Sequence, residues 1–238
     1  MDNDGVAIVS GGLDSITMLY KLLFQDNRRP FVLSFDYGQR HVREISAAGE
    51  VCNLLGIEQR VFDFTDFGWI TELSGSALVD DTVVVPEGHY AAETMKATVV
   101  PNRNMAMISI AAAFCISIKG DYVATAIHSG DHAIYPDCRP GFIQAMRSAI
   151  RIANEGFVHP NFHIYTPFIL QSKTDIATLA QVLAVPIEKT WSCYNGREQH
   201  CGRCGTCVER QEALHNAGVP DLTPYEDSEF WKEQVAKL

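Results

Sequence analysis

Apolar residues along the chain follow two patterns that alternate from one segment to the next. Val6 to Val9 is apolar at every position, which is typical of a strand buried on both faces of a parallel sheet. Asp14 to Phe24 then repeats apolar residues three and four positions apart, the spacing of an amphipathic helix. The chain therefore begins with a strand that leads directly into a helix.

The same alternation continues over most of the sequence. Further strands are expected at 31–35, 58–64, 122–127 and 162–168, and further helices at 41–55, 105–118, 141–155, 173–183 and 207–215. Gly56 is expected to end the helix 41–55, while Asn104 and Ser172 are expected to cap the starts of 105–118 and 173–183. This order predicts an α/β fold with a doubly wound parallel sheet of about five strands.

One long segment follows neither pattern. Residues 66–98 have no clear periodicity and contain Gly75, Pro86 and Gly88. A segment of this kind is either a lid over a site or an excursion between core elements, and both interpretations remain open. Residues 1–190 would form the main domain, and residues 191–238 a small helical appendage.

The turn after the first strand is the strongest candidate for a ligand site. It consists of Ser10, Gly11, Gly12, Leu13, Asp14 and Ser15. Backbone N–H groups in such a turn, with a helix N-terminus behind them, form a cradle for phosphate. An ordinary glycine-rich turn is the alternative. We predict an ATP site in which Asp14 orients the loop or bridges to the phosphates through Mg²⁺.

Two other expected strands end in loops that are rich in polar groups. The second strand is followed by Tyr37, Gln39, Arg40 and His41, and the fourth by His128, Asp131, His132, Tyr135, Asp137 and Arg139. Open α/β sheets bind ligands at the carboxyl ends of their strands, so we predict that these residues bind the substrate. Gly130 disfavours a helical metal site between the two histidines, and Cys138 is expected to be a packed thiol.

Two basic residues stand at the starts of expected helices. Arg103 precedes the helix 105–118, and its forked guanidinium can bind phosphate or carboxylate oxygens in pairs. Lys173 lies in the first turn of 173–183, where helices favour acidic side chains instead. Either residue could be a solvated surface charge. We predict that both act on phosphate, and that Asp14, Arg103 and Lys173 form the catalytic set.

Four of the seven cysteines are crowded into one short segment. They are Cys193, Cys201, Cys204 and Cys207, in the spacing Cys-x₇-Cys-x₂-Cys-x₂-Cys. Four thiolates this close form a closed tetrahedral site for structural Zn²⁺, with no position left for water. An iron–sulfur cluster is the alternative, because Cys-x₂-Cys-x₂-Cys also ligates clusters.

Composition narrows the class of partner. The chain has 238 residues, 47% of them apolar, and a formal net charge of −10. An acidic protein is a poor match for a large nucleic-acid surface, so a small-molecule substrate is favoured. We see no apolar run long enough to span a bilayer. The acidic residues Asp2 and Asp4 differ from the basic start of a secretory signal, so a cytoplasmic location is expected.

Several motifs carry a family resemblance. The segment SGGLDS resembles the signature of the PP-loop ATP pyrophosphatases, which adenylate a carboxylate or a carbonyl oxygen and release pyrophosphate. Together with YGQRH, the VPxRN segment, YPDCR, TWSCYNG and CGxCxxC, it is similar to the QueC family of 7-cyano-7-deazaguanine synthases. The resemblance runs in order from about Val6 to Arg210. It implies a Rossmann-like PP-loop domain with a Cys₄ zinc site, and a homodimer.

The resemblance also implies a reaction. Enzymes of this family convert 7-carboxy-7-deazaguanine, ammonia and ATP to the nitrile, through an adenylated carboxylate and then an amide. Arg103 and Lys173 would balance the developing phosphoryl charge. Asp131 or Asp137 would accept the N–H and amino donors of the guanine-like edge.

One departure from the family leaves the product open. The loop before YPDCR commonly reads ETDxSG, whereas His128 to His132 reads HSGDH in this chain. The enzyme could therefore stop at the amide, or join the deazaguanine carboxylate to another amine, including one on a protein. A tRNA-modifying PP-loop enzyme and a non-enzymatic zinc module are more distant alternatives.

Overall fold

The architecture is a five-stranded parallel sheet covered by helices on both faces. The computed structural model describes residues 4–90 and 93–237. The strands are β1 (Gly5–Ile8), β2 (Pro30–Asp36), β3 (Gln59–Asp63), β4 (Tyr122–Ala124) and β5 (His163–Tyr165), in the order β3-β2-β1-β4-β5. Because the first strand is central and the order reverses beside it, the carboxyl ends of β1 and β4 form a switch point. The predicted doubly wound sheet is confirmed.

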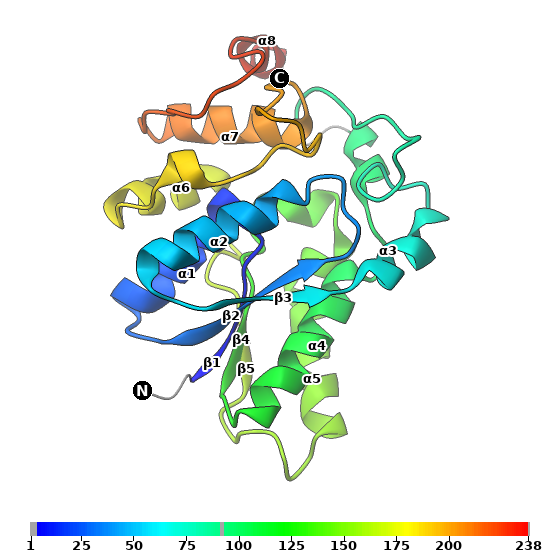
Figure 1. Ribbon diagram of the computed structural model, residues 1–238, viewed down its shortest axis with the longest axis vertical. Coiled ribbons are helices and arrows are strands. Elements are labelled where there is room, and N and C mark those ends of the chain that lie inside the picture. Colours follow the sequence, from blue (N-terminus) through cyan, green and yellow to red (C-terminus); the bar gives the residue numbers. More distant parts are fainter. Residues whose placement is uncertain (1–3, 91–92, 238) are drawn as a thin grey trace.

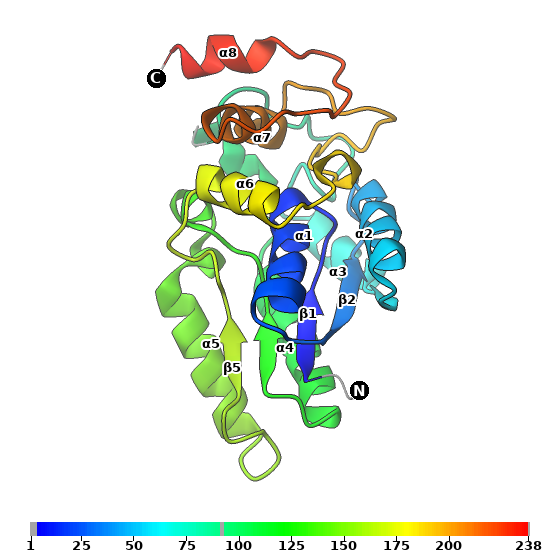
Figure 2. The ribbon, with the colours of Figure 1, turned by 90° about the vertical axis from the view of Figure 1, so that its left-hand side faces the viewer.

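Helices pack on each face of this sheet. The α-helices of the described residues are α1 (Leu13–Tyr20), α2 (Arg43–Leu55), α3 (Thr65–Glu72), α4 (Arg103–Ser117), α5 (Pro140–Ala153), α6 (Lys173–Val182), α7 (Gly205–Asn216) and α8 (Phe230–Val235). Neighbouring residues of β1 point to opposite cores: Val6 packs with α4 and α5, and Ala7 packs with α1, α2 and α6. Figures 1 and 2 show α6, α7 and α8 stacked at one end of the molecule. None of the described helices has the length and apolar character needed to cross a bilayer.

The predicted helix ends are confirmed at two of three positions. Gly56 ends α2 in the left-handed conformation, with φ +65°. Ser172 caps α6, where its hydroxyl accepts the Asp175 N–H and the Asp175 carboxylate accepts the Ser172 N–H. The prediction for Asn104 is wrong: α4 begins earlier, behind Asn102, and the Asn104 side chain donates instead to Cys138 Sγ at 3.3 Å.

The segment 66–98 contains more regular structure than its sequence predicts. Helix α3 covers its start and a 3₁₀ helix, Glu93–Thr98, covers its end. Trp69 and Ile70 of α3 are exposed, so the helix lacks the apolar stripe by which it could be predicted. Between the two helices, Ala77 and Val85 pack in one cluster with the four cysteines of 193–207. Residues 66–98 thus cover the C-terminal cysteine cluster, and Tyr90 in this segment lines the cavity described below. Their role as a lid or as an excursion stays a prediction.

Gly11 fixes the distance between the turn after β1 and helix α2. Its φ is +105°, and a Cβ built on it would lie 1.9 Å from the backbone oxygen of Glu44. The backbone oxygen of Gly11 also accepts the Trp191 N–H at 2.9 Å. Only glycine allows this conformation and this contact together, so three distant parts of the chain meet at this residue.

We expect Gly11→Ala to lower the free energy of unfolding by about 2–4 kcal/mol, because the methyl group has to displace the α2 backbone. Urea denaturation followed by circular dichroism measures the change. Gly141→Ala is the matched control, since a Cβ there meets nothing within 4 Å, and it should change stability by less than about 1 kcal/mol. Equal stability of the two variants would contradict the role of Gly11.

Candidate active site

A cavity lies at the switch point of the sheet. Its wall comes from the loops after β1, β2 and β4, from the first turns of α2, α4 and α6, from the N-terminal half of α7, and from Trp191, Ser192 and Tyr194. The starts of α2, α4 and α6 therefore lie at the same end of the sheet, and helix N-termini favour anions. The cavity therefore lies where an α/β sheet of this order is expected to bind a ligand.

The turn after β1 forms one end of this cavity. The Ser15 hydroxyl accepts the Gly11 N–H and donates to the Gly12 carbonyl, each at 3.1 Å, and Ser10 Oγ accepts the Gly12 N–H at 3.3 Å. These contacts hold the turn in one shape. No side chain caps α1, which begins at Leu13, so its first N–H groups remain available to an anion.

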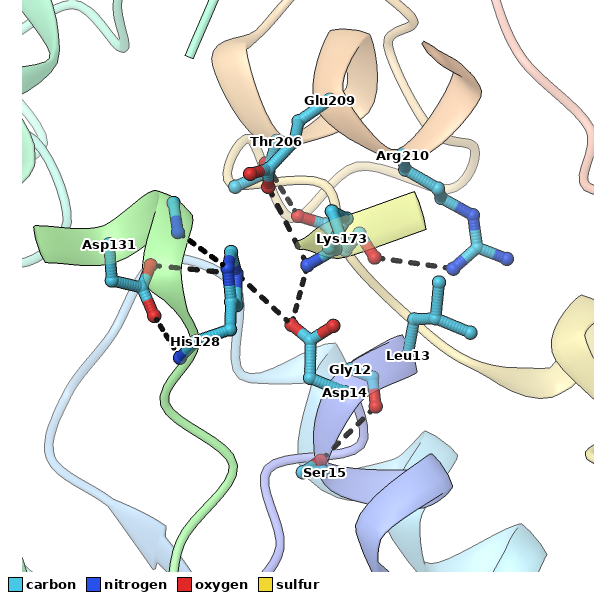
Figure 3. A network of polar contacts seen from close by, with 12 residues as sticks. Gly12, Leu13, Asp14, Ser15, His128, Asp131, Lys173, Thr206, Glu209 and Arg210 are labelled. Atoms are coloured by element: carbon cyan, nitrogen blue, oxygen red, sulfur yellow. Dashed lines mark hydrogen bonds and ion pairs between the residues drawn. The ribbon is translucent and has the colours of Figure 1, made fainter. Parts of the chain in front are cut away.

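A cluster of charged side chains stands beside this turn (Figure 3). Lys173 Nζ is 2.5 Å from Asp14 Oδ2 and 3.5 Å from Glu209 Oε2, and all three side chains are at least four-fifths buried. His128 Nε2 lies 3.9 Å from the same Asp14 oxygen and 3.7 Å from Asp131 Oδ1. The cluster joins α1, α6 and α7 to the loop after β4.

The cluster keeps opposite charges together. Burial disfavours the ionised form of Asp14, but the charges of Lys173 and His128 outweigh it and hold the pKa of that carboxyl below its ordinary value. Burial likewise disfavours the charged form of Lys173, and Asp14 and Glu209 more than compensate and raise its pKa. Burial raises the pKa of Glu209, and the charge of Lys173 only partly offsets this rise. At neutral pH, Asp14 is a carboxylate and Lys173 is an ammonium.

Aromatic residues surround the other end of the cavity. Tyr37, His41, Tyr135 and Tyr194 line it together with Arg103. The Arg103 guanidinium lies 5.9 Å from the centre of the Tyr37 ring, and the His41 and Tyr194 rings are 5.3 Å apart. Arg103 is therefore grouped with aromatic rings, whereas Lys173 is grouped with the turn after β1.

Most of the residues predicted from the sequence meet in this cavity. Its lining includes Ser10, Gly12, Leu13, Asp14, Ser15, Tyr37, His41, Arg103, His128, Asp131, Tyr135 and Lys173. Gly11 belongs to the same turn but is not among the lining residues, because it packs against α2. Burial raises the pKa of Cys138 well above its usual range, and this thiol packs in the wall, as expected. Five predicted substrate residues, Gln39, Arg40, His132, Asp137 and Arg139, are not among the lining residues.

Gln39 and Arg40, which follow β2, are held by hydrogen bonds to the backbone. Arg40 turns toward residues 66–98, where its Nη2 donates to the backbone oxygens of Asp80 at 2.8 Å and Val83 at 3.0 Å. The Gln39 amide oxygen accepts the Tyr37 N–H at 2.8 Å, and its nitrogen donates to the Phe35 oxygen at 3.1 Å. Both side chains hold the loop in shape, and their predicted role in substrate binding stays a prediction.

Of the three that follow β4, Asp137 and Arg139 have similar structural contacts, whereas His132 Nε2 is buried without a hydrogen-bond partner among the described residues. Asp137 Oδ2 accepts the Asn104 N–H at 3.3 Å, at the start of α4. Arg139 Nε donates to the His132 backbone oxygen at 2.8 Å. The spacing of these residues predicts their loop correctly, but it does not determine which side chains face the cavity.

Several lining residues are not predicted from the sequence. Glu44 and Glu209 add two carboxylates, and Tyr90, Ser192 and Thr206 add hydroxyls. Glu44 lies in the first turn of α2, where an acidic residue is ordinary, and so it gives no distinctive signal. Glu209 follows Cys207 by two positions, and only the packing of α7 against α6 brings it to the cavity.

The four clustered cysteines form a candidate metal centre. The Sγ atoms of Cys193, Cys201, Cys204 and Cys207 all lie within 4.8 Å of one another, and all four residues are buried. Cys201 Sγ accepts the Cys204 N–H at 3.3 Å, and Cys193 Sγ accepts the Cys201 N–H at 3.3 Å. Four buried thiols with backbone N–H groups directed at their sulfurs fit a metal held by thiolates alone.

This centre is next to the cavity in the chain and in space. Helix α7 starts at Gly205, immediately after Cys204, and presents Thr206 and Glu209 to the cavity. Arg210 is fully buried behind them, where its guanidinium donates to Thr190 Oγ1 at 2.7 Å. The cysteine cluster therefore anchors the helix that completes one wall of the site.

Fold and site together define an α/β protein with a glycine-rich turn at its switch point and, beside it, four buried cysteines that could hold a metal. A family profile described as "Queuosine biosynthesis protein QueC" matches residues 4–218. The chain belongs to this QueC family.

Relatives with curated names cover nearly the whole chain. The 7-cyano-7-deazaguanine synthase of Rhizobium rhizogenes is 50% identical over 226 residues, 95% of this chain and 93% of that protein. The enzyme of the same name from Ruegeria pomeroyi is 49% identical over 230 residues, 97% of each chain. A solved NMN synthetase from Francisella tularensis reaches a TM-score of 0.48 at 14% identity, covering 99% of this chain and 86% of that one, too weak a likeness for inference.

We expect Cys204→Ser to lose most of its bound metal and to unfold at a temperature lower by about 10 °C or more, because a buried thiolate cluster cannot close without its fourth sulfur. Elemental analysis of the purified protein and a thermal melt measure the two effects. Cys52→Ala is the control, since Cys52 packs in the other core and should leave the metal content unchanged. Full metal content in Cys204→Ser would contradict a four-cysteine site.

Proposed function

We propose that this protein is an ATP-dependent ligase that converts 7-carboxy-7-deazaguanine and ammonia to 7-cyano-7-deazaguanine. The names of its relatives give the reaction class. The observation that carries the proposal is the cavity itself, in which a phosphate-binding turn and an aromatic, polar chamber share one wall. Such a site can hold the phosphates of ATP and a flat heterocycle in contact with each other.

The chemistry requires an activated carboxylate. An oxygen of a carboxylate is a poor leaving group, whereas AMP is a good one. The substrate carboxylate attacks the α-phosphorus of ATP and releases pyrophosphate. Ammonia then displaces AMP to give the amide, and a second ATP activates the amide oxygen, so that loss of AMP gives the nitrile. Each cycle consumes two ATP and releases two AMP.

The residues at the turn suit the first step. The N–H groups at the start of α1 bind phosphate oxygens, and the ammonium of Lys173 offsets the charge that develops on the leaving pyrophosphate. The sequence predicts that Arg103 shares this role. Its place among the tyrosines supports a role at the heterocycle instead.

Two metal ions fit the residues that are present. Asp14 Oδ1 is buried and has no hydrogen-bond partner among the described residues, so it can hold the Mg²⁺ that accompanies ATP. Mg²⁺ neutralises phosphate charge when it is bound. The four cysteines suit Zn²⁺ in a structural role, since four thiolates complete its coordination. We also propose that the enzyme acts as a cytoplasmic homodimer.

The protein, given 7-carboxy-7-deazaguanine, ammonium, ATP and Mg²⁺, should release AMP and pyrophosphate, and mass spectrometry should detect the nitrile. Asp14→Ala and Lys173→Ala should each reduce AMP formation at least 100-fold, because each removes one member of the charge cluster at the phosphate turn. Their metal content should remain that of the parent protein. Lys189→Ala, a partly exposed lysine paired with Glu50, is the control and should retain full activity.

The products distinguish the alternatives. The amide alone would indicate an enzyme that stops one step earlier, and a conjugate formed with an added amine would indicate a different acceptor. Release of ADP in place of AMP, or no turnover of ATP at all, would contradict adenylation of the carboxylate. Full activity of either alanine variant would refute the role given to that residue.

A further inference from the structure

Four of the described residues that line the cavity carry a carboxylate, and three are already committed. Asp14 and Glu209 pair with Lys173 at the phosphate end. Asp131 uses both of its oxygens: Oδ1 accepts the Tyr90 hydroxyl at 3.1 Å, and Oδ2 accepts the His128 N–H at 3.2 Å. Glu44 is the fourth, and the charge cluster does not use it.

Glu44 is buried and held in a defined position. Its Oε1 lies 3.3 Å from Gln39 Nε2 and 3.4 Å from His41 Nε2. Its backbone oxygen lies directly against Gly11, so the first turn of α2 cannot shift away from the phosphate turn. Burial raises the pKa of Glu44 to about 8, although Arg103 and Gln39 oppose that shift. A ligand that donates hydrogen bonds to this carboxyl would favour its ionised form.

His41 adds a second polar group to the same end. It is 5% exposed, and its Nδ1 has no hydrogen-bond partner among the described residues. Burial lowers the pKa of His41 to about 3, with Arg103 and Arg40 acting in the same direction, so the ring is neutral. A buried polar atom without a partner in a cavity wall indicates that a polar ligand contacts this region.

Arg103 and the tyrosines complete the chamber. The Arg103 guanidinium supplies hydrogen-bond donors, and its charge influences both Glu44 and His41. Tyr37 and Tyr194 are aromatic neighbours of the His41 ring, at 6.5 and 5.3 Å between ring centres. The chamber thus offers a carboxylate as acceptor, a guanidinium as donor, and aromatic surfaces for a flat ring.

We propose that Glu44 determines specificity for a guanine-type edge: its carboxylate accepts the ring N1–H and the 2-amino group, while Arg103 donates to the 6-oxo oxygen. This inference rests on the proposed function, because it concerns the heterocycle of that substrate. It gives Glu44 the role predicted from the sequence for Asp131 or Asp137. The 2-amino group lies across the bicycle from the 7-carboxylate, so this orientation directs the carboxylate away from Glu44 and into the rest of the cavity.

A pair of ligands that differ only at the 2-amino group tests the role of Glu44. Isothermal titration calorimetry should show that the parent protein binds 7-deazaguanine about 10- to 100-fold more tightly than 7-deazahypoxanthine, which lacks that group. In Glu44→Gln this preference should fall to about threefold or less, because a carboxamide replaces one acceptor with a donor. The KM for 7-carboxy-7-deazaguanine should rise at least tenfold, with the KM for ATP unchanged.

Glu50→Gln is the matched control. Glu50 lies on the same helix, its side chain is 65% exposed, and its variant should bind both ligands as the parent protein does. A thermal melt should show that Glu44→Gln remains folded, since the variant removes a carboxyl whose burial is unfavourable and keeps its shape.

Three results would overturn the inference. Glu44→Gln that keeps the parent preference would show that another group reads the 2-amino group. A parent protein that binds both ligands equally but forms AMP from the carboxylate would refute the role of Glu44 and leave the proposed function intact. A parent protein that binds neither ligand and forms no AMP would refute both.

Discussion

The buried ion pair between Asp14 and Lys173 is the interaction on which the site depends most. Isolated charges are costly to bury, so each of these side chains is stable in this place only because the other is present. Glu209 adds a second carboxylate to Lys173 from α7. The phosphate turn, the start of α6 and the helix behind the cysteine cluster therefore have to assume one relative arrangement. A change at any of the three would alter the position of the charged side chains while leaving the four cysteines in place.

This coupling gives the C-terminal segment a part in the active site. The cysteine cluster, Ala77 and Val85 form one apolar group, and Ala213 of α7 packs in the same core as α1. Part of the segment 191–238 therefore forms a wall of the cavity. The division at residue 190 remains a prediction. None of the four clustered cysteines lines the cavity. A metal bound to them would therefore affect catalysis only through the position of α7.

The sequence predicts features that depend on local spacing better than those that depend on side-chain direction. The strands, the phosphate turn and the four cysteines each lie within a short segment, and their patterns are readable without the fold. Arg40 and Glu44 show the limit of such prediction, because they are only four positions apart. Arg40 turns toward residues 66–98, whereas Glu44 faces the cavity. Glu209 reaches the site only through the packing of α7, which no local pattern specifies.

The central claim is that a carboxylate oxygen of the substrate attacks the α-phosphorus of ATP. The most direct test is a reaction with 7-carboxy-7-deazaguanine labelled with ¹⁸O in both carboxylate oxygens, followed by mass spectrometry of the nucleotide products. The account predicts AMP that carries one ¹⁸O atom, first from the carboxylate and then from the amide oxygen, with unlabelled pyrophosphate. Unlabelled AMP, or label in pyrophosphate or inorganic phosphate, would contradict it.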